Sequence, residues 1–429
     1  MTAGTRLLII SFDAVGDHVL DRLGARPNTG AFLRSATTAR DVRSVFLTNT
    51  YPVHCSVVTG VPPAVHGLIS NVPPFPRRHP VWNYRASGIR AKTLWQAVHE
   101  KGFSAASVLW PVTGGAREIR YNLPEIMPRP GDSQLLLNLK NGSPVMQIRL
   151  WLRYRNLLQG IRQPALDRFA VAAMADILRR HRPKLALMHL SAYDGLCHIH
   201  GEDFDRLDTA LEVLDEGLGV LLDAFTGGAG DTAVILFSDH AQLNVEKNVR
   251  PNSILLEMGL LRRDAEGAYH PGGSGCFIEC CGGSAFFHPG KLLEDGEGRT
   301  AMAAIRRRLE ETPGFHRWLG EEEMNECGRG TLPGKSPGGL PFGFCVLPGY
   351  NCEEYGHEEK AQHGYPADYG GYRVFYAVRG RTVPRGKTLR GGSLLDIAPL
   401  ALRLLGQGLP PERAPVLPDL PPAREDFFA

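Results

Sequence analysis

The sequence predicts an α/β protein with a doubly wound, mainly parallel central sheet that is flanked by helices. The first observation behind this fold class is a set of short apolar or β-branched runs, and the second is the amphipathic helical stretches between them. Buried parallel strands read as continuous apolar runs, and their alternation with helices is typical of this architecture. The predicted strands are residues 7–12, 44–46, 104–110, 184–190, 232–237 and 372–378.

Three helices are predicted between these strands, and each has a recognisable stop. Residues 93–102 show an apolar stripe that ends at a glycine, and residues 165–181 are followed by Arg182-Pro183. Residues 205–225 form a longer amphipathic stretch that ends before Gly227-Gly228. Glycine after the last periodic residue and proline just beyond it are helix-stop signals.

We expect one catalytic domain over residues 1–429, with insertions at about 72–165 and about 265–365. The chain is long enough to bury a large core. Proline-rich stretches such as VPPFPRRHP (72–80) mark the first insertion. The motifs GGSG, CCGG, PGKSPGG and LPGY mark the second, which is therefore expected to be loop-rich.

Composition and charge narrow the function classes. The formal net charge is +3 over 429 residues, and basic and acidic residues are scattered along the chain. This distribution predicts no nucleic-acid partner and no membrane partner. The first apolar run, residues 7–12, is too short for a signal peptide, and a spanning helix needs about 20 apolar residues. We therefore expect a cytoplasmic protein, with its eight cysteines reduced.

Carboxylate and imidazole side chains follow the predicted strands. Because open parallel sheets bind ligands outside the carboxyl ends of their strands, we expect these side chains to converge on one edge. Carboxylate oxygen and imidazole nitrogen form a zinc-type ligand set, although manganese or iron would accept the same atoms. The candidates are Asp13, Asp194, His198, Asp239, His240 and, just before the last strand, His363.

Each of these fragments alone is weak evidence. A single aspartate after a strand is more often a helix N-cap, and a single histidine is more often structural. Asp194 and His198 are four residues apart, which places both on one face of a helix. Asp239 and His240 are adjacent, and a turn after the strand can aim both at one ion. All five fragments at strand ends favour a metal site.

The order SFDAVG, TNTYPVH, HGLISN, DxxxH, FSDH and QHGY resembles the alkaline phosphatase superfamily, and within it the nucleotide pyrophosphatase/phosphodiesterase branch. The resemblance runs from Asp13 to about residue 406. It implies an alkaline-phosphatase-like fold and two divalent metal ions, with Zn²⁺ preferred. One ion would be held by Asp13, Asp239 and His240, and the other by Asp194, His198 and His363.

The resemblance also implies roles for three neighbouring residues. Thr50 occupies the position of the metal-coordinated nucleophile. Asn71 matches the asparagine that hydrogen-bonds a non-bridging phosphoryl oxygen. Tyr51 follows the nucleophile directly, where relatives that cleave nucleotides carry an aromatic residue that stacks on the base. The substrate would be a small-molecule phosphoryl ester.

The chemistry of Thr50 is coherent without this analogy. A threonine hydroxyl is a poor nucleophile at neutral pH because its pKa is very high. A bound divalent ion lowers such a pKa, and two ions about 4 Å apart can hold the attacking and leaving oxygens in line. We therefore predict a metal-dependent phosphodiesterase that acts through a phospho-threonine intermediate.

Two departures from the family pattern bear on the substrate. The second base-stacking position, five residues before Asp194, is His189, so a nucleotide slot is in doubt. The stretch VPPAVHG (61–67) is similar to phosphonoacetate hydrolases of the same superfamily, so hydrolysis of a carbon–phosphorus bond stays an alternative. A phosphomonoesterase is another, although no arginine lies next to the nucleophile. A metal-binding protein without catalysis is weaker, because nucleophile, Asn71 and ligands are all present.

Overall fold

The computed structural model describes residues 4–406, except residues 229, 272–274, 294–295, 331–341 and 357. Its centre is an eight-stranded sheet in the order β17-β2-β16-β6-β1-β5-β3-β4. The strands are β1 (Arg6–Phe12), β2 (Thr37–Val42), β3 (Ala105–Val108), β4 (Ile119–Leu123), β5 (Leu185–Leu190), β6 (Thr232–Phe237), β16 (Val374–Arg379) and β17 (Thr388–Arg390). Only β16 runs antiparallel to its neighbours in this sheet. The predicted α/β fold with a mainly parallel sheet is confirmed.

Five of the six predicted strands are present, but the prediction of a strand over residues 44–46 is wrong. The strand in this region is β2, which ends at Val42 and pairs with β16 and β17. Phe46 and Leu47 are buried under the second sheet of the molecule, against Phe286 and Cys345. Apolar character here therefore reflects contact with another part of the chain and not membership of the central sheet.

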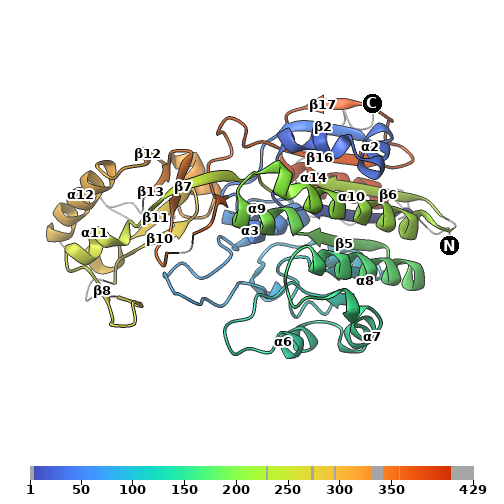
Figure 1. Ribbon diagram of the computed structural model, residues 1–429, viewed down its shortest axis with the longest axis horizontal. Helices are drawn as coiled ribbons and strands as arrows, with labels where there is room; N and C mark the ends of the chain where they lie inside the picture. The colour runs from blue at the N-terminus through green and yellow to red at the C-terminus, as the bar shows by residue number, and fades with distance from the viewer. Residues whose placement is uncertain are drawn as a thin grey trace.

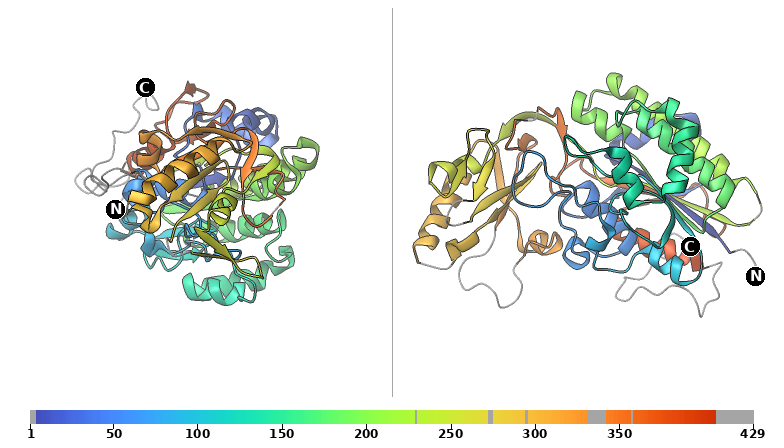
Figure 2. Two further views of the ribbon diagram at one scale, coloured as in Figure 1. Left: turned by 90° about the vertical axis from the view of Figure 1, so that its left-hand side faces the viewer. Right: turned by 90° about the horizontal axis from the view of Figure 1, so that it is seen from below.

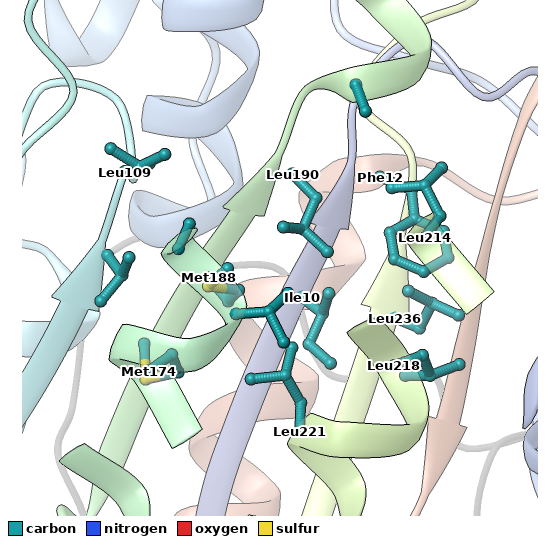
Figure 3. Packing of buried hydrophobic residues seen from close by; sticks show 14 of the residues in the cluster. Ile10, Phe12, Leu109, Met174, Met188, Leu190, Leu214, Leu218, Leu221 and Leu236 are labelled. Carbon is teal, nitrogen blue, oxygen red and sulfur yellow. The ribbon is translucent and has the colours of Figure 1, made fainter. Parts of the chain in front are cut away.

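Helices cover both faces of the sheet, as the alternation of side chains along β1 requires. Leu8 and Ile10 face a core formed with α8 (Ala165–His181) and α10 (Phe204–Thr226). Figure 3 shows Ile10 of β1, Met188 of β5 and Leu236 of β6 against Leu218 and Leu221 of α10 and Met174 of α8. The opposite face carries Leu7 and Ile9 against α3 (Thr50–Thr59), α5 (Leu94–Glu100) and α14 (Ile397–Gly406).

The segment after β6 builds a second lobe that lies at one end of the molecule, on the left in Figure 1 and again on the left of the right-hand view in Figure 2. Its sheet has the order β10-β11-β13-β12, and α11 and α12 pack beside it. Glycine and proline content predicted mostly loops here, yet the described residues of this segment contain regular strands. The bounds are α11 (Asn252–Glu257), β10 (Phe277–Cys281), β11 (Ser284–His288), α12 (Gly296–Glu310), β12 (Phe315–Trp318) and β13 (Gly343–Val346).

Shorter elements connect the two lobes and complete the first insertion. α6 (Gln134–Asn141) and α7 (Pro144–Tyr154) lie together at the lower edge of the molecule in Figure 1. Among the described residues, no helix has both the length and the apolar character to span a bilayer. The remaining elements are α1 (Leu20–Gly24), α2 (Pro27–Arg34), α4 (Pro63–His66), α9 (Ala192–His200), α13 (Glu321–Glu326), β7 (Leu243–Val249), β8 (Leu261–Arg263), β9 (Tyr269–Pro271), β14 (Gly349–Cys352) and β15 (Ala361–Gln362).

Candidate active site

Side chains that follow β1, β5 and β6 converge at the carboxyl edge of the central sheet. Two groups of ligand-type atoms lie there, and the atoms within each group are within 4.8 Å of one another. One group is Asp13, Asp239 and His240, and the other is Asp194, His240 and His363. Parallel strands bring these residues together because all their carboxyl ends meet on one side of the sheet.

The first group is fully enclosed. Asp13 is 2% exposed, and Asp239 and His240 are 0% exposed. The Nε2 atom of His240 lies 3.4 Å from Asp13 Oδ1 and 3.3 Å from Asp239 Oδ2. Asp13 Oδ1 and Asp239 Oδ2 are buried and have no hydrogen-bond donor among the described residues. Buried carboxylate oxygens without a donor are costly unless a cation binds them.

The second group is more open, and of its three members only Asp194 lies on α9. His198, which the resemblance assigned to the second ion, lies on the same helix but belongs to neither group of atoms. Asp194 and His198 are one helical turn apart, and His198 Nε2 lies 3.3 Å from Asp194 Oδ1. His363 packs close to His240, with ring centroids 4.2 Å apart. His240 Nε2 therefore lies between the two groups, although the resemblance assigned it to the first.

Each candidate histidine ligand points Nε2 toward the carboxylates and keeps Nδ1 in a hydrogen bond. Nδ1 of His240 lies 3.2 Å from the carbonyl of Ala241, and Nδ1 of His198 lies 3.0 Å from the carbonyl of Ala361. A carbonyl can only accept, so both Nδ1 atoms carry a proton, which leaves Nε2 as the ligand atom of the neutral imidazole. Burial and the neighbouring His240 ring hold the pKa of His363 well below its ordinary value, which favours the neutral ligand form.

Thr50 is the first residue of α3, and its hydroxyl faces the first group. Thr50 Oγ1 lies 3.3 Å from His240 Nε2. The positive end of the helix dipole points toward this place, and the backbone N–H of Thr50 lies at the first position of the helix. Asn71 accepts a hydrogen bond at Oδ1 from the Tyr51 N–H at 2.9 Å, so its NH₂ group stays available for an oxygen in the cavity.

Tyr51 does not lie at the cavity surface. Its side chain is 0% exposed, and its ring contacts Trp82 edge-on at a centroid distance of 5.1 Å. Trp82 lines the cavity in its place. The sequence pointed to Tyr51 because it follows the nucleophile, but it could not show that a residue 31 positions later covers it.

His189 is the main residue whose role the sequence did not reveal. It lies in β5, with Nε2 2.9 Å from Asp13 Oδ2 and Nδ1 3.1 Å from the carbonyl of Leu109. Burial alone would lower the pKa of His189, but the Glu125 and Asp13 carboxylates raise it well above its ordinary value. Its position inside an apolar strand was the available signal, since a buried polar side chain needs a partner.

A cavity of about 350 Å³ leads from the ligand groups to the surface. Its inner wall includes Asp13, Thr50, Asn71, Asp194 and His363. Its outer wall is largely apolar and carries two further carboxylates, Glu125 and Glu359. Among the described residues, neither lysine nor arginine lines this cavity. Apart from the histidines, positive potential at the reacting position would come from the helix N-terminus and from bound cations.

The donor set fits divalent metal ions. It combines aspartate oxygens with imidazole nitrogens, which are the ligands of zinc-type sites. Burial and the nearby Asp194 and Asp239 carboxylates raise the pKa of Asp13 well above its ordinary value, so the protein alone stabilises its ionised form poorly. Bound cations would remove this penalty.

An α/β fold with a carboxylate–imidazole cluster around a threonine at a helix N-terminus fits the class of hydrolases that act on phosphoryl groups. Residues 7–313 match the family model described as type I phosphodiesterase / nucleotide pyrophosphatase. The chain belongs to this family, whose members hydrolyse phosphoric ester bonds.

Curated relatives agree with this assignment. Ectonucleotide pyrophosphatase/phosphodiesterase family member 1 of Rattus norvegicus is 24% identical over 242 residues, which are 54% of this chain and 23% of that protein. The bis(5'-adenosyl)-triphosphatase of Xenopus laevis is 27% identical over 110 residues, which are 25% of this chain and 24% of that protein. The chain thus spans about a quarter of the length of these relatives.

Solved structures show the same fold. Murine ectonucleotide pyrophosphatase / phosphodiesterase 5 superposes with a TM-score of 0.66 over 99% of this chain and 100% of that chain, at 15% identity. An inactive threonine-to-alanine variant of that protein, in complex with AMP, gives the same TM-score at 16% identity.

Proposed function

We propose that this chain is a two-metal phosphodiesterase that acts through a phospho-Thr50 intermediate. The observation that carries the proposal is the position of Thr50 Oγ1, 3.3 Å from His240 Nε2 and at the N-terminus of α3. Asp13, Asp239 and His240 would hold one ion, and Asp194, His198 and His363 the other. These ions, preferably zinc, would lower the pKa of the attacking hydroxyl and stabilise the leaving oxygen.

In the first step, Thr50 Oγ1 attacks phosphorus, and the bond from phosphorus to the leaving oxygen breaks. The alcohol departs and the phosphoryl group stays on Thr50. In the second step, water attacks phosphorus, the bond to Thr50 Oγ1 breaks, and the phosphomonoester product is released. The Asn71 NH₂ group and the backbone N–H of Thr50 would stabilise the charge on the non-bridging oxygens in both steps.

The cavity supports a diester over the alternatives. A monoester carries one more negative charge on the phosphoryl group, and phosphonoacetate adds a carboxylate. Both would favour a lysine or an arginine at the reacting position, but the described lining has neither and includes Glu125 and Glu359. The name of the family and the AMP bound to the murine relative also support phosphoryl esters as substrates.

The deciding experiment compares kcat/KM of the zinc-loaded protein on a nitrophenyl phosphodiester and on the matching monoester. We expect at least about a tenfold preference for the diester, which equals about 1.4 kcal/mol in the transition state. Thr50→Ala is expected to abolish turnover and to leave bound zinc nearly unchanged, whereas Thr50→Ser is expected to retain part of it. Turnover by Thr50→Ala at the wild-type rate would exclude the covalent mechanism.

A further inference from the structure

Exposed apolar side chains are concentrated in one part of the molecule. Of the fourteen large hydrophobic side chains that the described residues expose, eight lie between residues 127 and 161. Surface hydrophobics scattered singly need no explanation, but a cluster marks an interaction site. The eight are Met127, Leu135, Leu136, Val145, Ile148, Trp151, Leu152 and Ile161, and we call the surface they form the α6–α7 face.

Helix α7 has two apolar stripes, of which one is buried in the protein and the other is exposed. Met146 and Leu150 are buried in the main core beside α8. Val145, Ile148 and Leu152 are 83%, 46% and 59% exposed. They are spaced by three and four residues and therefore form one line on the outer side of the helix. Burial in the protein does not account for this second stripe.

Basic side chains outnumber acidic ones around this face. Residues 133–166 contain five basic residues and neither aspartate nor glutamate. The balanced charge of the whole chain therefore hides a local excess of positive charge. Asp176 of α8 offsets part of it, because it accepts a hydrogen bond from Arg149 at 2.8 Å and lies 3.9 Å from Arg153. The five basic residues are Lys140, Arg149, Arg153, Arg155 and Arg162.

The mouth of the catalytic cavity adjoins the same face. Met127 and Ile161 are 42% and 47% exposed, and both also line the cavity. Gln134 and Asn138 of α6 line it as well, and Leu135 and Leu136 follow Gln134 directly. Whatever covers the α6–α7 face therefore lies next to the opening that leads to Thr50.

We propose that the α6–α7 face docks on the surface of an anionic phospholipid bilayer. A basic helix with an exposed apolar stripe lies in the bilayer interface, where its side chains enter the boundary of head groups and acyl chains and its cations contact anionic lipids. A second copy of the chain fits less well, because a two-fold contact through this face would bring two sets of five cations together. The expectation of no membrane partner, drawn from the overall charge, is thereby revised.

Docking in this orientation would present lipid head groups to the cavity. This consequence rests on the proposed phosphodiesterase function, and it names the phosphodiester groups of membrane lipids as a substrate class. The largely apolar outer wall, which includes Trp82, Leu109, Ile126 and Leu166, suits a substrate with an apolar or aromatic part better than a polyanion.

Co-sedimentation of the full chain tests the docking surface. The vesicles are phosphatidylcholine alone or phosphatidylcholine with phosphatidylglycerol. We expect binding to the anionic vesicles and release at high salt, because salt screens the lipid charge. Leu152→Glu is expected to weaken binding about tenfold or more, since it replaces the burial of one leucine side chain with that of a charge. Val220→Glu is the matched control, because Val220 is 41% exposed on α10.

Three results would overturn the docking proposal. They are wild-type protein that stays in solution with both vesicle types, equal losses for Leu152→Glu and Val220→Glu, and a wild-type dimer in solution that Leu152→Glu dissociates. Turnover of the soluble nitrophenyl diester is measured in parallel, and Leu152→Glu should keep it while losing turnover of a vesicle-borne diester. Binding without turnover of either diester would instead refute the proposed function.

Discussion

Two clusters of buried ionisable side chains differ in what neutralises their carboxylates. In the cluster around Asp13 and Asp239, two carboxylate oxygens have no donor among the described residues. In the second lobe, Glu279 accepts a hydrogen bond from Arg329 Nε at 3.1 Å, and its Oε2 lies 3.0 Å from His288 Nε2. Glu279 and Arg329 have side chains that are only 3% and 4% exposed.

The pKa shifts in the two clusters have opposite directions, although burial acts in the same sense on both. Burial and like charges raise the pKa of Asp13. Burial would also raise the pKa of Glu279, but the Arg329 guanidinium and His288 lower it to about 2. The cluster that supplies its own cation is structural. The first cluster has His189 beside Asp13, but two of its buried carboxylate oxygens have no donor among the described residues, so an external cation, and therefore chemistry, is expected there.

The largest expected effect comes from removing one carboxylate of the first cluster. Asp13→Asn should lower kcat/KM on the nitrophenyl diester by at least about 1,000-fold, because one metal ligand is lost. In the presence of a chelator, the same variant should unfold at the same or a higher temperature than the wild type, because a buried carboxylate beside two other carboxylates is replaced by a neutral amide. Differential scanning calorimetry with and without chelator measures this.

A lower unfolding temperature for metal-free Asp13→Asn than for metal-free wild type would contradict this contrast between the two clusters. It would mean that the Asp13 carboxylate stabilises the fold without a cation. Metal content by elemental analysis serves as the control that the chelator has acted.

The matching substitution in the second lobe should have the opposite profile. Glu279→Gln leaves the Arg329 guanidinium buried without its carboxylate, and breaking such a pair costs about 3–5 kcal/mol. Urea unfolding should show this loss, while kcat per folded molecule should stay within about tenfold of the wild type. Arg329 also donates a hydrogen bond to the carbonyl of Ile69 at 3.0 Å, two residues before Asn71, which is why a modest effect on kcat is allowed. A variant as stable as the wild type would show that the pair is not structural.

The pH dependence of stability follows from the same pair. The pKa of Glu279 is about 2 in the folded chain, against an ordinary value of 4.5. Its contribution to stability is therefore fully present above about pH 4.5 and is lost as the pH falls toward 2. Between about pH 4.5 and pH 2, the free energy of unfolding should fall less steeply with decreasing pH in Glu279→Gln than in the wild type. Equal pH dependence of the unfolding free energy in the two proteins would show that the Glu279 carboxylate does not stabilise the fold.

The smallest expected effect concerns the two aromatic residues beside the nucleophile. Trp82 lines the cavity and Tyr51 is covered, so Trp82→Ala should raise KM for an aryl diester by about three- to tenfold through lost contact area. Tyr51→Phe keeps the packing and should change KM for the same aryl diester by less than twofold. Steady-state kinetics separates the two, and a larger effect for Tyr51→Phe would restore Tyr51 as the substrate contact.

Much of the fold could be predicted from the sequence, because strands that are buried on both faces of a sheet appear as continuous apolar segments. The runs that became β1, β5 and β6 are continuous apolar segments, and α8 has the bounds predicted for it. The strand prediction for residues 44–46 was wrong because an apolar segment can be buried by contacts outside any sheet. The second lobe was read as loops because short antiparallel strands carry glycine and proline at their ends.

The sequence by itself determined which side chains could meet. Asp13, Thr50, Asp194, Asp239, His240 and His363 each follow or precede a strand of one parallel sheet, and the geometry of such a sheet leaves one edge for all of them. Only the tertiary structure decided that His189 contacts Asp13, that Trp82 covers Tyr51, and that the outer stripe of α7 is exposed beside the cavity mouth. The reason is physical, because strand order and periodicity are local properties of the chain, whereas side-chain contacts and exposure depend on segments distant in sequence.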